Sequence, residues 1–198
     1  MQRIVLASNN PGKIREIRRW LAPLGFEILP QSDLGIPEAE EPYGTFIENA
    51  LAKARQACRA AGLPALADDS GICVTALNGA PGVHSARFAG DPCSDERNNA
   101  KLLALMEGVT DRRAHYYCVM VLLRHANDPQ PLIAEGEWHG EIVHAPRGTG
   151  GFGYDPLFLD PRLGRTGAEL ALEEKNRVSH RGKALARLAE RLSRSAPE

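Results

Sequence analysis

Two adjacent carboxylates, Asp68 and Asp69, follow an apolar run and precede Ser70 and Gly71. An apolar segment that stops at such a tetrapeptide predicts a buried strand that delivers its acids where the strand ends, which is where α/β folds keep their chemistry. Because neighbouring side chains on a strand point to opposite faces, we expect one acid to take part in chemistry and the other to support it.

Carboxylates this close together repel each other, and a divalent cation is the usual device that keeps both ionised in a partly buried site. Their oxygens are hard ligands, so the pair favours Mg²⁺ or Mn²⁺. The same tetrapeptide is also typical of a polar turn in which Asp and Ser cap backbone amides. The segment alone leaves a metal site and a capped turn as alternatives.

The polar segment 8–13 follows a short strand-like run and precedes apolar residues at helical spacing. Pro11 suits the first turn of a helix, and Asn9 or Asn10 can cap it. A loop at a helix N-terminus presents backbone N–H groups to an anion, and Lys13 adds a positive charge. The P-loop and dinucleotide patterns are absent, so phosphate binding and an ordinary capped connection both stay open.

Two further segments stand out in the second half of the chain. Residues 145–156 carry four glycines within six positions, with the aromatic Phe152 among them and Tyr154 and Asp155 directly after them. Ordering such a loop costs entropy, which indicates either close backbone approach to a ligand or a tight corner. The basic run 175–183 precedes a helix start, where an anion would bind, or it forms a solvated face.

Hydrophobic periodicity predicts the elements that must position these residues. The chain is expected to be extended from residue 65 to the acids and again at 72–77, with further strands at 4–7, 26–30, 115–125 and 132–143. Helices are expected from Pro11 to Gly25, from Thr45 to Gly62, from Ser94 to Gly108, at 166–174 and at 181–192.

Two of these expectations are specific. The turn at 127–130 predicts that the two long strands beside it form an antiparallel hairpin, and the uniformly apolar run 118–123 predicts a central place in the sheet. Thr45 and Glu48 are spaced as a capping box at the start of the second helix.

The composition is that of an ordinary globular chain, with 198 residues, 43% hydrophobic residues and a net charge of −1. The length suits a single domain, and a charge near zero gives no field that favours nucleic acid. The four widely spaced cysteines, without a C-x-x-C pair, indicate buried thiols in a reducing cytoplasm. No apolar run reaches signal-peptide or membrane-spanning length, so we expect a cytoplasmic protein with neither a membrane nor a nucleic-acid partner.

Five segments, taken together and in this order, resemble the inosine/xanthosine triphosphate pyrophosphatases. They are Ser8-Asn9-Asn10-Pro11-Gly12-Lys13, Thr45-Phe46-Ile47-Glu48-Asn49-Ala50, Ala67-Asp68-Asp69-Ser70-Gly71, Gly150-Gly151-Phe152-Gly153-Tyr154-Asp155-Pro156 and Ser179-His180-Arg181-Gly182. The resemblance covers nearly the whole chain.

The resemblance implies a Mg²⁺-dependent, homodimeric cytoplasmic enzyme, with Mn²⁺ as a possible substitute. The enzyme would hydrolyse ITP, dITP and XTP to the monophosphate and pyrophosphate, clearing deaminated purines from the nucleotide pool. The implied fold is α/β, a long mixed sheet flanked by helices, with two lobes and a central substrate cleft in one domain, 1–198.

Site residues carried over by the resemblance are as follows. Asp69 would be the proton acceptor and a metal ligand, with Glu41, or alternatively Glu40, as the other ligand. The phosphates would be bound by Ser8, Asn9, Asn10, Pro11, Gly12, Lys13 and Ser70, with Lys53 as a further substrate contact. The base would be recognised by Phe152, Gly153, Tyr154, Asp155, Lys175, His180 and Arg181.

The chemistry expected is attack of water on a phosphorus, oriented by Asp69, without a covalent intermediate. Donors from His180 and Arg181, or backbone amides near Phe152, would be satisfied by a 6-oxo purine and left unpaired by adenine. Two alternatives remain at this level. One is a phosphatase with Asp69 as nucleophile, which releases orthophosphate, and the other is a nucleotide sensor that binds without turnover.

Overall fold

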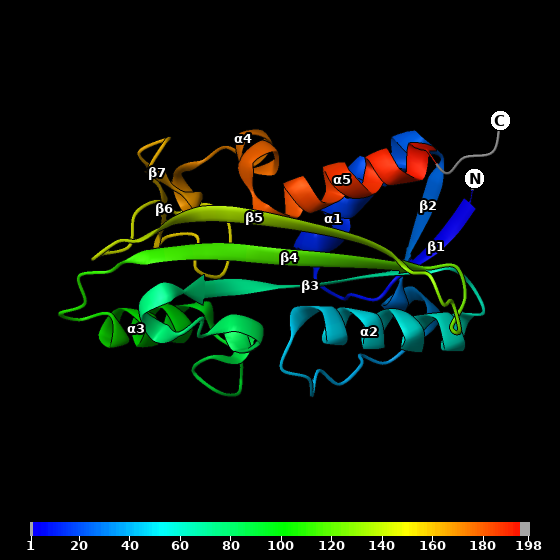
Figure 1. Ribbon diagram of the computed structural model, residues 1–198, viewed down its shortest axis with the longest axis horizontal. Helices are drawn as coiled ribbons and strands as arrows, with labels where there is room; N and C mark the ends of the chain where they lie inside the picture. The colour runs from blue at the N-terminus through cyan, green and yellow to red at the C-terminus, as the bar shows by residue number, and fades with distance from the viewer. Residues whose placement is uncertain (1, 195–198) are drawn as a thin grey trace. The chain divides into compact units, whose positions relative to one another are not determined.

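The computed structural model describes residues 2–194, and within them seven strands form one sheet in the order β2-β1-β3-β4-β5-β6-β7 (Figure 1). The strands are β1 (Gln2–Leu6), β2 (Phe26–Pro30), β3 (Ala65–Val74), β4 (Arg113–Leu123), β5 (Leu132–Ile142), β6 (Phe158–Asp160) and β7 (Arg165–Thr166). β1 is parallel to β2 and β3, whereas β6 is antiparallel to β5 and β7. The predicted mixed sheet is confirmed.

Helices surround the strands, as predicted. They are α1 (Pro11–Leu21), α2 (Phe46–Ala61), α3 (Asp95–Leu105), α4 (Leu172–Val178) and α5 (His180–Arg194). Short 3₁₀ helices occupy Ala22–Leu24, Gln31–Leu34, Thr75–Leu77, Gly82–Arg87 and Gly167–Glu169. In the described residues, no helix is both long enough and apolar enough to cross a membrane.

The first three α-helices begin at the caps that the sequence indicates. Asn10 Oδ1 accepts hydrogen bonds from the backbone N–H groups at the start of α1, and Thr45 Oγ1 accepts one from the Glu48 N–H at 3.4 Å. Ser94 caps α3 in the same way. Gly62, at φ +64°, ends α2 in the left-handed conformation that glycine adopts without strain.

The chain forms two compact units. The first contains the chain up to Asp69, then Cys118–Gly136 and the chain from Lys183 onward, and the second contains Ser70–Tyr117 and Glu137–Gly182.

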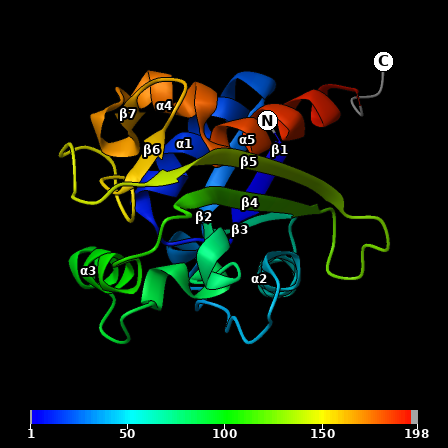
Figure 2. The ribbon, with the colours of Figure 1, turned by 60° about the vertical axis from the view of Figure 1, so that its left-hand side comes forward.

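In the first unit, α1 and α5 cover one face of the strands and α2 covers the other (Figures 1 and 2). Leu6 on β1, Ile17 on α1 and Leu185 on α5 belong to one buried cluster. The inner face of α2 is made of small residues, among them the fully buried Ala50 and Ala54. Small side chains let this helix approach the sheet closely, which sets the distance between its polar residues and the strands.

In the second unit, the core is built around aromatic rings. Trp138 and Phe158 are fully buried, with ring centroids 4.8 Å apart in an edge-on arrangement. Trp138 Nε1 donates a hydrogen bond of 2.9 Å to Asp160 Oδ2, which satisfies both buried polar groups. Ile72 and Leu102 join the same cluster.

The prediction that a strand ends at the two acids is wrong, because β3 continues through Asp68 and Asp69 to Val74. In the parallel register Leu6 lies opposite Leu66, so β1 ends at that level and the acids lie just beyond its carboxyl end. They can stay inside a strand because Lys13 and Lys53 compensate their charges. The capped-turn alternative is excluded, and residues 75–77 are a 3₁₀ helix rather than extended chain.

The predicted helix at 166–174 is also wrong. Residues Arg165–Thr166 form β7, a 3₁₀ helix follows at Gly167–Glu169, and α4 begins only at Leu172. Thr166 and Glu169 form a reciprocal capping box at the start of the short helix, and Leu170, which is extended at φ −85° and ψ 140°, ends it. The basic run 175–183 is therefore divided between α4 and α5 rather than being a connection between helices.

The long strands agree with prediction in their positions. β4 and β5 are neighbours in the sheet, and β4, with residues 118–123 buried throughout, has three strands on either side of it among the described residues. All four cysteines are free thiols. Cys58 and Cys118 are buried as expected, but Cys93 is exposed because it lies in the polar loop before α3.

Candidate active site

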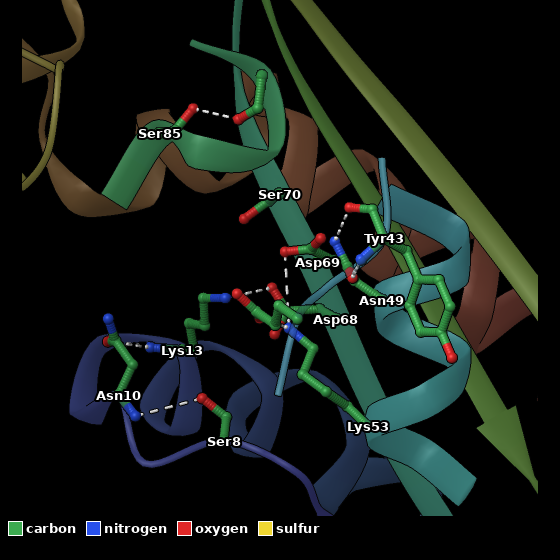
Figure 3. A network of polar contacts seen from close by, with 12 residues as sticks. Ser8, Asn10, Lys13, Tyr43, Asn49, Lys53, Asp68, Asp69, Ser70 and Ser85 are labelled. Carbon is green, nitrogen blue, oxygen red and sulfur yellow. Dashed lines mark hydrogen bonds and ion pairs between the residues drawn. The ribbon is translucent and has the colours of Figure 1, made fainter. Parts of the chain in front are cut away.

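Five charged side chains of the first unit form what we call the carboxylate–lysine cluster, made of Lys13, Glu41, Lys53, Asp68 and Asp69. Lys13 Nζ lies 3.0 Å from Asp68 Oδ2, and Lys53 Nζ lies 2.6 Å from Glu41 Oε1 and 3.6 Å from Asp69 Oδ1. Figure 3 shows the two lysines reaching the strand from α1 and α2. Lys13 thus contacts Asp68 and Lys53 contacts Asp69, and the expectation that the two acids have different roles stays a prediction.

Lys13 is positioned by the cap of α1. Asn10 Oδ1 accepts hydrogen bonds from the Gly12 and Lys13 N–H groups at 2.8 and 3.1 Å, and the Asn10 N–H donates to Ser8 Oγ at 3.2 Å. Asn9 Nδ2 donates to Glu38 Oε1 at 2.9 Å. The predicted phosphate loop is therefore a well-capped helix start, and its charge is carried by the Lys13 ammonium group.

Asn49 lies in one of the five segments, but the sequence reasoning assigned it no role. It is fully buried on α2, and its amide both accepts from the Tyr43 N–H at 3.1 Å and donates to the Tyr43 carbonyl at 3.2 Å (Figure 3). This pair of bonds fixes the loop before α2 close to Glu41. A polar residue directly before the apolar stripe of a helix is the signal that could have identified it.

Electrostatics in the cluster favour a proton acceptor at Asp69. Burial raises the pKa of Asp69, the Lys53 charge opposes this shift, and the charges of Glu41 and Asp68 add to it. Burial alone would lower the pKa of Lys53, but the negative charges of Asp69, Asp68 and Glu41 outweigh it and the net shift is upward. A carboxylate whose pKa is shifted toward neutral pH is better matched to accepting a proton.

The donor chemistry of the cluster fits Mg²⁺ or Mn²⁺. Across residues 2–194, no three His, Cys, Asp or Glu side chains converge on one point that could hold a metal. Mg²⁺, however, is usually bound by one or two carboxylates together with waters and substrate phosphates. Glu41 and Asp69, which share Lys53, supply two such carboxylates, whereas Glu40 is exposed.

A second group, in the other unit, surrounds the ring of Phe152, which is 41% exposed. Lys175 Nζ lies 4.8 Å and the Arg181 guanidinium carbon 5.8 Å from the centroid of this ring. We call Phe152, Lys175 and Arg181 the aromatic–cation cluster. Both cations are more than nine-tenths buried, so the Phe152 ring is the most exposed part of this cluster.

The remaining predicted base contacts lie below the surface. His180 stacks on the buried Tyr116 with centroids 4.6 Å apart and planes nearly parallel. Arg181 Nη2 donates a 3.0 Å hydrogen bond to Ser70 Oγ, which joins a predicted phosphate contact to a predicted base contact within one unit. Tyr116 is a second residue that the sequence reasoning missed, since nothing local marks it.

Asp155 and Tyr154 hold the loop that carries Phe152. Asp155 Oδ2 accepts a 2.9 Å hydrogen bond from the Phe152 N–H and forms an ion pair with Lys175. The Tyr154 hydroxyl donates to the Ser85 carbonyl at 2.8 Å. A Cβ at Gly151 would lie 2.0 Å from Asp155 Oδ2, so glycine is needed there for close packing. In this structure Asp155 and Tyr154 therefore hold the loop in place, and Phe152 is the ring that the loop carries.

Comparison with known proteins shows a match to the Ham1 family over residues 4–191. The chain belongs to the Ham1 family. A relative from Nitrosomonas europaea, named dITP/XTP pyrophosphatase, is 67% identical over 193 residues, which cover 98% of this chain and 95% of the relative. A second relative with that name, from Ralstonia nicotianae, is 67% identical and covers 97% of each chain.

Ham1 membership is supported by structure as well as sequence. The solved structure of a HAM1 protein from Coxiella burnetii aligns with a TM-score of 0.95 at 48% identity, covering 98% of this chain and 100% of the other. The resemblance inferred from five short segments is therefore confirmed, as is the α/β fold class with a mixed sheet flanked by helices.

Proposed function

We propose that this chain hydrolyses deaminated purine nucleoside triphosphates, dITP, XTP and ITP, to the monophosphate and pyrophosphate. The observation that carries the proposal is the 67% identity, over nearly the full length of both chains, to relatives named dITP/XTP pyrophosphatase. The carboxylate–lysine cluster adds a chemical reason, because it combines a buried acid and two lysines in one place.

In the proposed mechanism, Asp69 orients a water molecule toward a phosphorus and accepts its proton. Lys13 and Lys53 exchange their present carboxylate partners for phosphate oxygens. Glu41 and Asp69 would hold Mg²⁺ or Mn²⁺, which when bound offsets negative charge on the phosphates. Asp68 keeps Lys13 in place while the site is free of substrate.

Base selection is assigned to the aromatic–cation cluster with its neighbour His180. The Phe152 ring offers a stacking surface, and the donors of Arg181 and His180 suit the 6-oxo group of hypoxanthine or xanthine. Adenine presents a donor at that position, so the protein donors would be left unpaired, which disfavours binding.

We also propose a cytoplasmic homodimer, on the basis of the resemblance and of the nucleotide substrates, which are cytoplasmic metabolites. Size-exclusion chromatography with light scattering tests the dimer, since the monomer mass is 21.5 kDa. Cell fractionation with an antibody against the native protein tests the location.

The deciding experiment is product analysis of the purified protein with Mg²⁺ and each of dITP, XTP, ITP, ATP and GTP. We expect pyrophosphate and the monophosphate from the first three and little product from ATP or GTP. Orthophosphate together with phosphorylated Asp69 would instead indicate the aspartyl phosphatase, and binding without product would indicate the sensor. The variant Asp69→Asn, purified in parallel, controls for contaminating phosphatases.

A further inference from the structure

The backbone of Gly153, in the loop that presents Phe152, is held on both sides by one helix. The Gly153 N–H donates a 2.6 Å hydrogen bond to Asp95 Oδ2, and the Gly153 carbonyl accepts a 3.0 Å hydrogen bond from Asn99 Nδ2. Asp95 and Asn99 are four residues apart on α3, so they lie on the same side of the helix, one turn apart. We call these two side chains the α3 clamp.

The clamp holds a residue that has no side chain of its own to pack. Gly153 has a φ of +63°, and no atom lies within 4 Å of where its Cβ would be, so side-chain packing does not fix this residue. A glycine also loses more backbone freedom on ordering than any other residue. The two hydrogen bonds from α3 oppose that cost at the residue directly after Phe152.

The chemistry of Asn99 indicates that stability alone does not explain the clamp. Its Oδ1 atom is buried and accepts no hydrogen bond from any residue in the range 2–194, while its Nδ2 atom holds Gly153. A buried acceptor without a partner carries a desolvation cost. Such a cost is tolerated where a group is needed for its position.

We propose that Asp95 and Asn99 are positioning residues for purine recognition, because they fix the Gly153 peptide and thereby orient the Phe152 ring for stacking. This inference rests on the proposed function, and it adds two residues outside the five segments that resemble the pyrophosphatases. Preorganising a binding loop lowers the ordering cost that the ligand would otherwise meet. Loss of the clamp therefore weakens base binding and leaves the phosphate chemistry intact.

The test compares Asp95→Ala and Asn99→Ala with the wild type in steady-state kinetics on dITP and ITP. We expect KM to rise about tenfold in each variant with kcat changed less than about twofold, as for loss of one charge-assisted or buried hydrogen bond that acts in ground and transition states alike. Asp95→Asn keeps an oxygen acceptor for the Gly153 N–H and should restore most of the KM.

Two controls separate positioning from general damage. Glu96→Ala removes the other acidic residue from the first turn of α3, so it matches the loss of helix-dipole stabilisation without touching Gly153. Inorganic tripolyphosphate, which has no base, serves as a competitive probe of the phosphate site. Its inhibition constant should be the same in all variants.

Unchanged KM in folded Asp95→Ala and Asn99→Ala would overturn the proposal, and so would equal weakening of tripolyphosphate and nucleotide binding. Calorimetric titration with IMP separates this inference from the proposed function. If the wild type binds IMP but hydrolyses nothing, only the proposed function fails, and the clamp is then judged on the IMP affinity. If the wild type neither binds nor hydrolyses purine nucleotides, both fail.

Discussion

The ammonium nitrogen of Lys53 lies 2.6 Å from Glu41 Oε1, so the loop before α2 is tied to the helix that follows it. Since Lys53 is also 3.6 Å from Asp69, one cation links the two carboxylates proposed as metal ligands. Exchange of the Glu41–Lys53 contact for a metal contact requires only that the Glu41 side chain change its partner.

Glu41→Gln is therefore expected to raise the Mg²⁺ concentration for half-maximal activity about tenfold or more, because one charged oxygen ligand is lost. Glu40→Gln is the matched control, since Glu40 is adjacent and exposed. Activity titrations against Mg²⁺ measure both. A shift in Glu40→Gln with none in Glu41→Gln would transfer the ligand role to Glu40. Chelation with EDTA should abolish turnover, and added Mg²⁺ should restore it.

Asp69→Asn is expected to lower kcat roughly 10³-fold, because the amide keeps the shape of the side chain but accepts no proton. The melting temperature should not fall, since the substitution removes one of three mutually repelling carboxylates from a buried site. Single-turnover rates check the expected loss of activity, and thermal melts check the expected melting temperature. A kcat near that of the wild type would remove Asp69 from the role of proton acceptor.

Gly182→Ala is expected to damage the turn between α4 and α5, because a Cβ at that position would lie 1.8 Å from the Asn176 carbonyl oxygen. Backbone cannot shift without cost, so the melting temperature should fall by roughly 5 °C or more. His180 and Arg181 directly precede Gly182, so KM for the nucleotide should rise as well. Gly44→Ala, at a glycine with no atom within 4 Å of its Cβ position, is the control and should change neither quantity.

Asp128 links stability to pH. Its pKa is held well below the ordinary value of 3.8 by hydrogen bonds from the Arg124 side chain, with further bonds from the backbone N–H groups of Arg124 and Gln130. A depressed pKa in the folded state stabilises the fold above the unfolded-state pKa, and this stabilisation is lost as pH falls through the folded-state value.

Asp128→Asn should therefore lower the melting temperature by about 3 °C at pH 7, with the difference from wild type shrinking progressively below about pH 4. Melting curves from pH 2 to 7 measure it. Asp33→Asn, at an exposed aspartate of the same unit, should show little difference at any pH. A difference that grows on acidification would contradict the sign of the linkage.

Elements whose ends are set by local chemistry could be predicted from the sequence. Asn10, Thr45 and Ser94 cap their helices, and Gly62 ends α2. Each of these residues interacts with backbone groups that are a few positions away in the sequence. The path of β3 could not be predicted, because Asp68 is compensated by Lys13, far away in the sequence. The helix predicted at 166–174 failed because Leu170, between the 3₁₀ helix and α4, is extended.

Some residues of the candidate site could likewise be proposed from the sequence, and others could not. Charged residues in distinctive segments, such as Lys13 and Asp69, could be proposed from residue type and spacing. Asn49, Asp95 and Asn99 could not be proposed in this way, because each is singled out by the backbone group to which it is hydrogen-bonded. For Asp95 and Asn99 that group is more than fifty residues away in the sequence.

The composition of the carboxylate–lysine cluster also bears on how a substrate arrives. Three carboxylates and two ammonium groups give these five side chains a formal charge of −1. We therefore expect this cluster to bind a bare polyphosphate more weakly than one whose charge is already offset by bound cations. The association rate of metal-free nucleotide should therefore rise with added salt, because screening weakens repulsion between like charges. The proposed site is therefore expected to bind the metal-bound nucleotide in preference to the metal-free one.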